Sequence, residues 1–170
     1  KGRGVPKNDE QAAKWFALAA AQGHAESQAN LGLMYDRGRG VAQSDKEAFK
    51  WYRLSAEQGD ADGQFNLALM YDDGRGVAEN QEEAVRLYRL AAAQNHVSSQ
   101  SNLGYMYDQG RGVAQDSKEA FKWYMVAAEQ GDANSQFNVG SMYALGRGVE
   151  QSWPQAYFWA LLAAKDGEKD

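Results

Sequence analysis

Apolar and polar residues follow a helical periodicity along this chain, in short segments separated by glycine-rich turns. In the first segment the apolar residues fall at positions 12, 15, 16, 19 and 20, which form one stripe of a helix. We predict this helix over about Asp9–Gln22, with Asn8 as its N-cap and Gly23 at its C-terminal end. The next two segments, about Ala25–Arg37 and Asp45–Gln58, have the same periodicity and predict a pair of helices, named helix A and helix B below.

A Gly-Arg-Gly-Val sequence joins helix A to helix B and sets the period of the chain. It occurs five times, always 36 residues apart, beginning at Gly2, Gly38, Gly74, Gly110 and Gly146. A fixed period of this length predicts a solenoid, because one helical hairpin cannot bury both of its faces alone. We therefore predict an all-α chain of nine helices that forms a single solenoid domain over residues 1–170. Its predicted parts are a half repeat at 1–23, full repeats at 24–59, 60–95, 96–131 and 132–167, and a tail at 168–170.

Composition excludes several classes of protein. The net charge of the 170 residues is −5 and no basic stripe is visible, so we predict that the chain does not bind nucleic acid. No apolar run approaches the roughly 18 residues of a membrane span. The chain has no cysteine, which excludes disulfides and thiolate chemistry. Because it begins with Lys1 inside a repeat, we expect a piece of a longer protein, and both a cytoplasmic and a periplasmic or secreted location stay open.

The motifs within each repeat resemble a known family. The first full repeat reads Leu31-Gly32-x-x-Tyr35, then Gly38-x-Gly40-Val41, then Ala48-x-x-Trp51-Tyr52. This pattern is similar to the Sel-one-like repeat family, which is related to the tetratricopeptide repeats. The resemblance implies a right-handed α/α superhelix that serves as an adaptor or scaffold in protein complexes, often in bacteria. It also implies that helix A lines a concave groove.

Asparagines recur on the side of helix A that faces away from the predicted core, at Asn30, Asn66, Asn102 and Asn138. An asparagine amide both donates and accepts hydrogen bonds, so a column of them is suited to hold the backbone of an extended peptide. The alternative is that each asparagine bonds the backbone or a loop of a neighbouring repeat. The sequence leaves both interpretations open.

Other positions on helix A add candidates for the same peptide-binding site. Aromatic residues at Phe65, Tyr105 and Phe137 stand where other repeats have different side chains, as expected of anchors that select a partner. Acidic residues at Asp36, Asp72 and Asp108 favour a basic peptide, unless they are only solvated. The recurring arginine of the loop, such as Arg39, is expected to bond helix carbonyls or a nearby carboxylate.

No catalytic or metal site stands out. His24 and His96 occupy the same position two repeats apart, about 20 Å or more by helix spacing, too far to share a metal. Neither has a nucleophile partner by motif, and no carboxylate pair stands out. We therefore predict no enzyme activity, no cofactor and no metal, and a protein or peptide as the partner.

The last helix differs from the earlier copies. It opens at Trp153-Pro154 and continues with Tyr157, Phe158 and Leu161, which make it apolar on nearly all sides. Either a further repeat, a partner or a second copy covers this surface, or it is a simple cap. The alternative to a peptide-binding scaffold is therefore a structural spacer that associates end to end through this helix.

Overall fold

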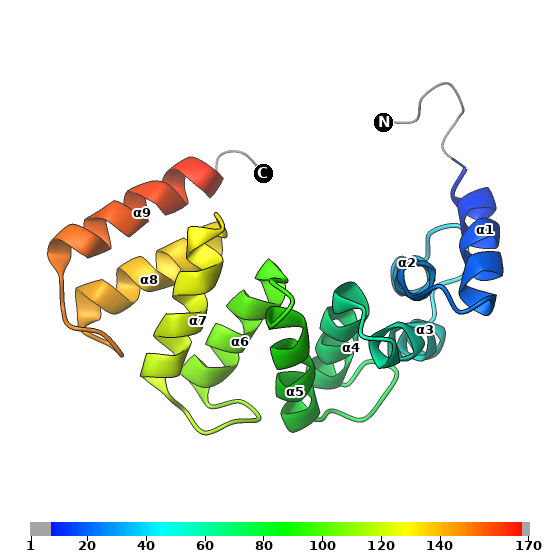
Figure 1. The fold of residues 1–170 in the computed structure, drawn as a ribbon, viewed down its shortest axis with the longest axis horizontal. Coiled ribbons are helices and arrows are strands. Elements are labelled where there is room, and N and C mark those ends of the chain that lie inside the picture. The colour runs from blue at the N-terminus through cyan, green and yellow to red at the C-terminus, as the bar shows by residue number, and fades with distance from the viewer. Residues whose placement is uncertain (1–7, 168–170) are drawn as a thin grey trace. The chain divides into compact units, whose positions relative to one another are not determined.

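The structure is a computed structural model that describes residues 8–167. This part of the chain forms nine α-helices and no strand, as predicted (Figure 1). The first Gly-Arg-Gly-Val copy and the predicted tail at 168–170 lie outside the described residues. The helices are α1 (Asp9–Ala21), α2 (Ala25–Arg37), α3 (Asp45–Glu57), α4 (Ala61–Asp73), α5 (Gln81–Ala92), α6 (Val97–Gln109), α7 (Ser117–Glu129), α8 (Ala133–Leu145) and α9 (Trp153–Gly167).

Local sequence explains where these helices begin and end. The Asn8 side chain caps α1 by accepting a hydrogen bond of 3.0 Å from the Gln11 N–H. Gly38 ends α2 in the left-handed conformation, with φ of 62°. The predicted ends at Gln22 and Gln58 are one residue too long, because both are C-caps with ψ of 2° and 1°.

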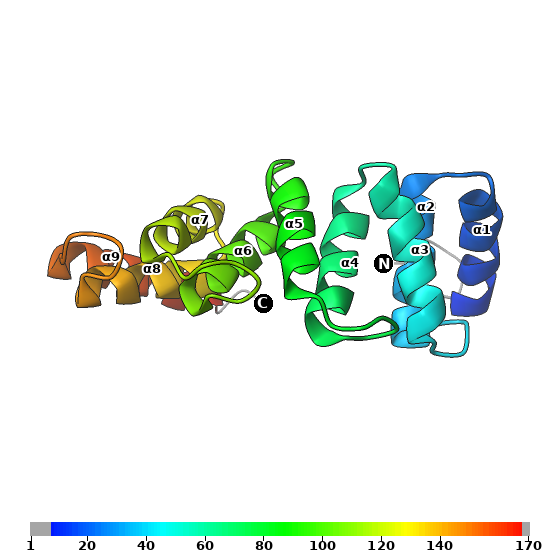
Figure 2. The same cartoon turned by 90° about the horizontal axis from the view of Figure 1, so that it is seen from below.

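The helices form two compact units, one with α1 to α4 up to Asn80 and one with α5 to α9 from Gln81 onward. Within each unit consecutive helices pack side by side (Figures 1 and 2). Each unit contains one junction at which both helices of a repeat are followed by helix A of the next repeat, and we call it the complete junction. In the first unit α4 packs on α2 and α3, and in the second unit α8 packs on α7. The single domain over residues 1–170 stays a prediction.

In the hairpins α2–α3 and α6–α7, a glycine of helix A lies in close contact with a tyrosine of helix B. A Cβ added at Gly32 would lie 2.7 Å from Cδ1 of Tyr52, and one at Gly104 would lie 2.7 Å from Cδ1 of Tyr124. Both tyrosines are buried. In these two repeats the absence of a side chain on the glycine leaves the volume that the tyrosine ring occupies.

An ion pair crosses the complete junction in each unit. Arg75 of one loop contacts Asp36 of the preceding helix A, with 2.5 Å between Nη1 and Oδ1. Arg147 pairs with Asp108 in the same way. The expected carboxylate partner of the loop arginine is thus confirmed, and it belongs to the repeat before. The pair is charge-assisted and links the two repeats.

Aromatic rings also meet at these junctions. Phe49 of α3 packs edge-on against Tyr71 of α4, with ring centroids 5.5 Å apart. Phe121 of α7 packs in the same way against Tyr143 of α8 at 5.2 Å. Helix A of the following repeat therefore covers helix B of the preceding one in both units.

A buried glutamine on helix A forms a third link that the sequence analysis did not identify. The Gln100 amide donates to the Ala92 carbonyl at 3.3 Å and its oxygen accepts a 2.6 Å hydrogen bond from Gln130. Gln28 makes the same two contacts with Ala20 and Gln58. Glutamine recurs at this position every 36 residues in the sequence. The hydrogen bonds that link it to two other helices depend on how the helices pack.

Candidate protein-binding surface

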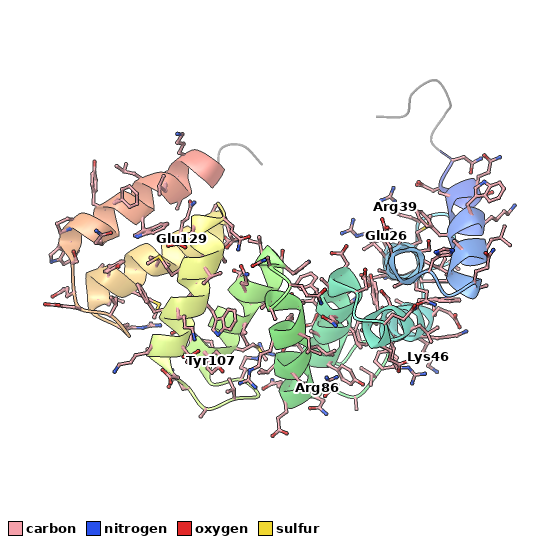
Figure 3. All side chains as sticks on the ribbon, viewed as in Figure 1. Glu26, Arg39, Lys46, Arg86, Tyr107 and Glu129 are labelled. Carbon is pink, nitrogen blue, oxygen red and sulfur yellow. The ribbon has the colours of Figure 1, made fainter. Side chains whose placement is uncertain are left out.

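On α2, one face points away from α3, the helix B of its own repeat, and we call this face and the matching positions of α4, α6 and α8 the outer A face. Figure 3 shows this direction for α2, where Glu26 extends from the side opposite α3. Each of the residues that define the outer A face is half-buried or exposed. They are Asn30 and Leu33 of α2, Asn66 and Leu69 of α4, Asn102 and Tyr105 of α6, and Asn138 and Ser141 of α8.

Two of the recurring asparagines bond their own helix. The Asn30 amide donates to the Glu26 carbonyl at 2.9 Å, and the Asn66 amide donates to the Asp62 carbonyl at 2.8 Å. Among the described residues, neither side-chain oxygen accepts a hydrogen bond. Because the nitrogen is held against the backbone, the oxygen is left as an acceptor on the outer A face.

Asn102 is placed differently, because its amide donates to the hydroxyl of Tyr88 at 3.1 Å. Tyr88 is a buried residue of α5, the helix B of the preceding repeat. At this position the asparagine therefore bonds a neighbouring repeat, as the alternative to peptide binding expects. Its partner is a tyrosine side chain and not the backbone or a loop. Asn138 is half-buried on α8.

The acidic candidates are mostly engaged inside the protein. Asp36 and Asp108 pair with Arg75 and Arg147, and their side chains are only 18% and 12% exposed. Asp72 is half-buried. Two of the three carboxylates that were expected to favour a basic partner therefore already pair with an arginine of the protein itself.

The aromatic candidates lie in different surroundings. Tyr105 is 43% exposed on the outer A face, with the Arg111 guanidinium 5.9 Å from its ring centre. Phe65 is half-buried, and Phe137 is 66% exposed. Ser101, the counterpart of Phe137 one repeat earlier, hydrogen-bonds Asp132 and Ser135 at the start of α8. That position therefore faces a following helix A, and Tyr105 is the one of the three aromatic candidates that lies exposed on the outer A face.

A cavity of about 270 Å³ opens between α1 and α2 beside Asn30. Its wall includes Phe16, which stands where the next three repeats have a tyrosine, and the Arg39–Asp9 ion pair of 3.3 Å. Such a concave, partly apolar site with a few polar groups suits one side chain of a bound peptide. The lining residues are Asn8, Asp9, Ala12, Phe16, Asn30, Leu33, Met34 and Arg39.

The described residues contain no group of three His, Cys, Asp or Glu side chains arranged to hold a metal. His96 instead caps α6, where Nδ1 accepts a hydrogen bond of 3.2 Å from the Ser99 N–H. Within residues 8–167 no helix has the length and hydropathy of a membrane span.

Comparison with known families decides the identity of the repeats. The Sel1 repeat family matches five consecutive segments, at residues 1–24, 25–60, 61–96, 97–132 and 133–168. The chain belongs to the Sel1 repeat family. Proteins built of Sel1 repeats are generally protein-interaction scaffolds, and the fold is typically not that of an enzyme.

Solved Sel1 structures agree with this assignment. One is a protective antigen of uropathogenic Escherichia coli strains with an SLR fold, at 38% identity and a TM-score of 0.92. The alignment covers 98% of this chain but only 36% of the E. coli protein, so the chain spans about a third of that relative. A Sel1 repeat protein of Oxalobacter formigenes is also 38% identical, with a TM-score of 0.89, over 96% of this chain and 68% of the other.

More distant structures share the fold alone. The cysteine-rich protein B of Helicobacter pylori matches at 22% identity and a TM-score of 0.59, over 79% of this chain and 97% of the other. A search of curated proteins gives no significant match.

Proposed function

We propose that this Sel1 repeat protein binds an extended peptide segment of a partner protein along the outer A face. The observation that carries the proposal is the pair of asparagines on α2 and α4. Their nitrogens are held by their own helices, which leaves both oxygens as exposed acceptors at the same position of successive repeats. Regularly spaced acceptors of this kind suit the N–H groups of an extended backbone.

Neighbouring residues supply the selectivity. The position three residues after each asparagine reads Leu33, Leu69, Tyr105 and Ser141, so a constant polar group lies beside a changing one. In the second unit, Tyr105 offers an exposed ring with a guanidinium nearby, which suits an aromatic or apolar peptide side chain. In the first unit, the cavity beside Asn30 offers room for one side chain.

The charge of the partner is not fixed by this surface. The carboxylates expected to favour a basic peptide are paired with loop arginines at Asp36 and Asp108. The proposal therefore rests on backbone and apolar recognition, which depends little on ionic strength.

A peptide selected from a phage-displayed library of random 12-residue peptides tests this function, with its affinity measured by isothermal titration calorimetry. We expect the double variant Asn30→Ala with Asn66→Ala, or the variant Tyr105→Ala, to weaken binding about fivefold or more, according to the unit that holds the peptide. The matched control is Leu90→Ala on α5, because Leu90 is also 43% exposed but lies on a helix B. Unchanged affinity in both outer A face variants would contradict the proposal.

A further inference from the structure

An apolar groove of about 400 Å³ lies between α8 and α9 in the second unit. Three of its aromatic side chains are largely exposed, Phe137 at 66%, Trp153 at 67% and Tyr157 at 68%. Exposed aromatic rings clustered around one hollow mark a binding surface more often than an ordinary solvated face. The lining residues are Phe137, Gly140, Ser141, Ala144, Trp153, Ala156, Tyr157 and Ala160, which we call the terminal groove.

Earlier repeats show what covers this surface inside the protein. Counterparts of its residues, 36 or 108 positions earlier, contact the following helix A and its loop. Phe121, the counterpart of Tyr157, packs on Tyr143. Asp108, the counterpart of Ala144, pairs with Arg147. The backbone carbonyl of Ser117, the counterpart of Trp153, lies against the loop glycine Gly148. The terminal groove therefore continues an interface that is built to receive a helix.

Three replacements change the chemistry of that interface. The aspartate that binds the loop arginine becomes Ala144, so the groove has no carboxylate at that position. The polar residue at the start of helix B becomes Trp153. The tyrosine that covers the helix A glycine at Gly104 becomes Ala160, so no ring fills the part of the groove that Ala156 and Ala160 line.

These replacements make a further repeat with the same loop arginine a poor fit for the groove. Its loop arginine would meet Ala144 and Trp153 and lose its charge partner, which is unfavourable for a cation at an apolar surface. Its helix A would also leave the volume beside Ala160 empty, and unfilled volume weakens packing. The groove instead fits a helix with a larger apolar side chain and no arginine at this point.

We propose that the terminal groove docks an amphipathic α-helix of a partner protein, which inserts a large apolar side chain beside Ala160, near Trp153 and Tyr157. The helix lies where helix A of a following repeat lies at the earlier junctions. This is recognition of a helix in a groove, with one aromatic or aliphatic anchor as its centre. It is a second binding surface, which shares Ser141 with the outer A face.

Two synthetic peptides built on the chain's own helix A provide the probes. The first has the sequence of residues 132–149, and the second carries Val139→Phe and Arg147→Leu. Both are stapled through their solvent-facing side so that each is helical before binding. Fluorescence anisotropy with the 170-residue chain should show at least about tenfold tighter binding of the substituted peptide, since burial of one large apolar side chain supports that difference.

Variants of the protein separate this proposal from its alternatives. Ala144→Asp with Ala160→Tyr should reverse the preference toward the unsubstituted peptide, because it restores the arginine partner and fills the space beside Ala160. Tyr157→Ala removes one wall at an exposed position, so it keeps the fold and should weaken the substituted peptide about tenfold. Leu145→Ala is the matched control on α8, exposed at 63% and outside the groove.

Three results would overturn the proposal. The first is no binding of either peptide, and the second is equal or tighter binding of the unsubstituted one. The third is a concentration-dependent dimer in light scattering that Tyr157→Ala returns to monomer, because a second copy would then occupy the groove. None of these results touches the outer A face, whose variants are tested with a different peptide.

Discussion

Arg75 Nη1 lies 2.5 Å from Asp36 Oδ1, although the two residues are 39 positions apart in the chain. The Asp36 side chain is 18% exposed and that of Arg75 is 34% exposed, so water screens the pair only in part. Arg75 also lies 3.8 Å from Asp45 and 3.6 Å from Asp73, which makes Asp36 its closest carboxylate. The pair joins two successive repeats of the first unit.

We expect Arg75→Gln to lower the free energy of unfolding by about 1–2 kcal/mol, because a charge-assisted hydrogen bond between repeats is lost. Urea denaturation measures this, and a double-mutant cycle with Asp36→Asn isolates the interaction from the other carboxylates. The control is the exposed pair Arg53–Glu57 at 3.5 Å on α3, for which we expect about 0–0.5 kcal/mol. Equal coupling energies in the two cycles would show that the junction pair has only the value of a surface pair.

Gly104→Ala should destabilise the protein by about 1–3 kcal/mol, because the new methyl group meets the Tyr124 ring. Gly140→Ala is the matched change one repeat later, where Ala160 replaces the tyrosine. Its Cβ would lie 3.1 Å from the Ala156 carbonyl oxygen, and the gain in helix propensity offsets this crowding. Thermal unfolding of the two variants compares them, and a loss at Gly140 as large as at Gly104 would contradict the assignment of the Gly104 effect to the Tyr124 ring.

Gln100→Met should lower the free energy of unfolding by about 1–3 kcal/mol, because it removes both hydrogen bonds of a buried amide and leaves the Ala92 carbonyl without this donor. The change nearly preserves side-chain volume, so packing alone contributes little. Gln11→Met at an exposed position of α1 is the control and should have almost no effect. Urea denaturation of both variants gives the comparison, and similar stabilities would mean that the glutamine network is dispensable.

Alkaline pH should destabilise the protein through Tyr52. Burial, and next the Asp36 carboxylate, raise the pKa of the Tyr52 hydroxyl above its usual value. The unfolded chain ionises this group near pH ~10, so the stability it contributes is complete below that pH and is lost as pH rises further. We expect Tyr52→Phe to show a smaller loss of unfolding free energy above pH ~10 than the unsubstituted protein.

The control for this titration is Tyr157→Phe, because Tyr157 is 68% exposed. At neutral pH Tyr52→Phe should change stability by less than about 0.5 kcal/mol, since the buried hydroxyl has no hydrogen-bond partner among the described residues. An unchanged alkaline profile in Tyr52→Phe would contradict the assignment to this group.

Sequence reasoning was most accurate where the determinants are local. The range Ala25–Arg37 is confirmed for α2, because Gly38 can take the left-handed conformation that ends a helix. The Asn8 cap of α1 is confirmed for the same kind of reason, since a cap and the N–H it accepts from lie within three residues. Where the expected ends were wrong, at Gln22 and Gln58, the error is one residue.

The candidate site was predicted less completely. Helix periodicity placed the asparagines away from the core, but Asn66 bonds its own helix while Asn102 bonds Tyr88. Both have the same spacing in the sequence, so the difference arises from the neighbouring packing. Asp36 likewise looks like an exposed acidic residue until its distance to Arg75 is known.

The sequence alone therefore determined the helices, the 36-residue repeat and the family, because periodicity, caps and turns act within a few residues of one another. Only the tertiary structure decided which polar residues bond between repeats and where apolar surface is exposed. Those properties depend on contacts between residues 14 to 39 positions apart, such as Tyr88 with Asn102 and Asp36 with Arg75, and on the volume left beside Ala160. Spacing along a helix specifies the direction of a side chain, whereas its partner is specified by the helix that packs against it.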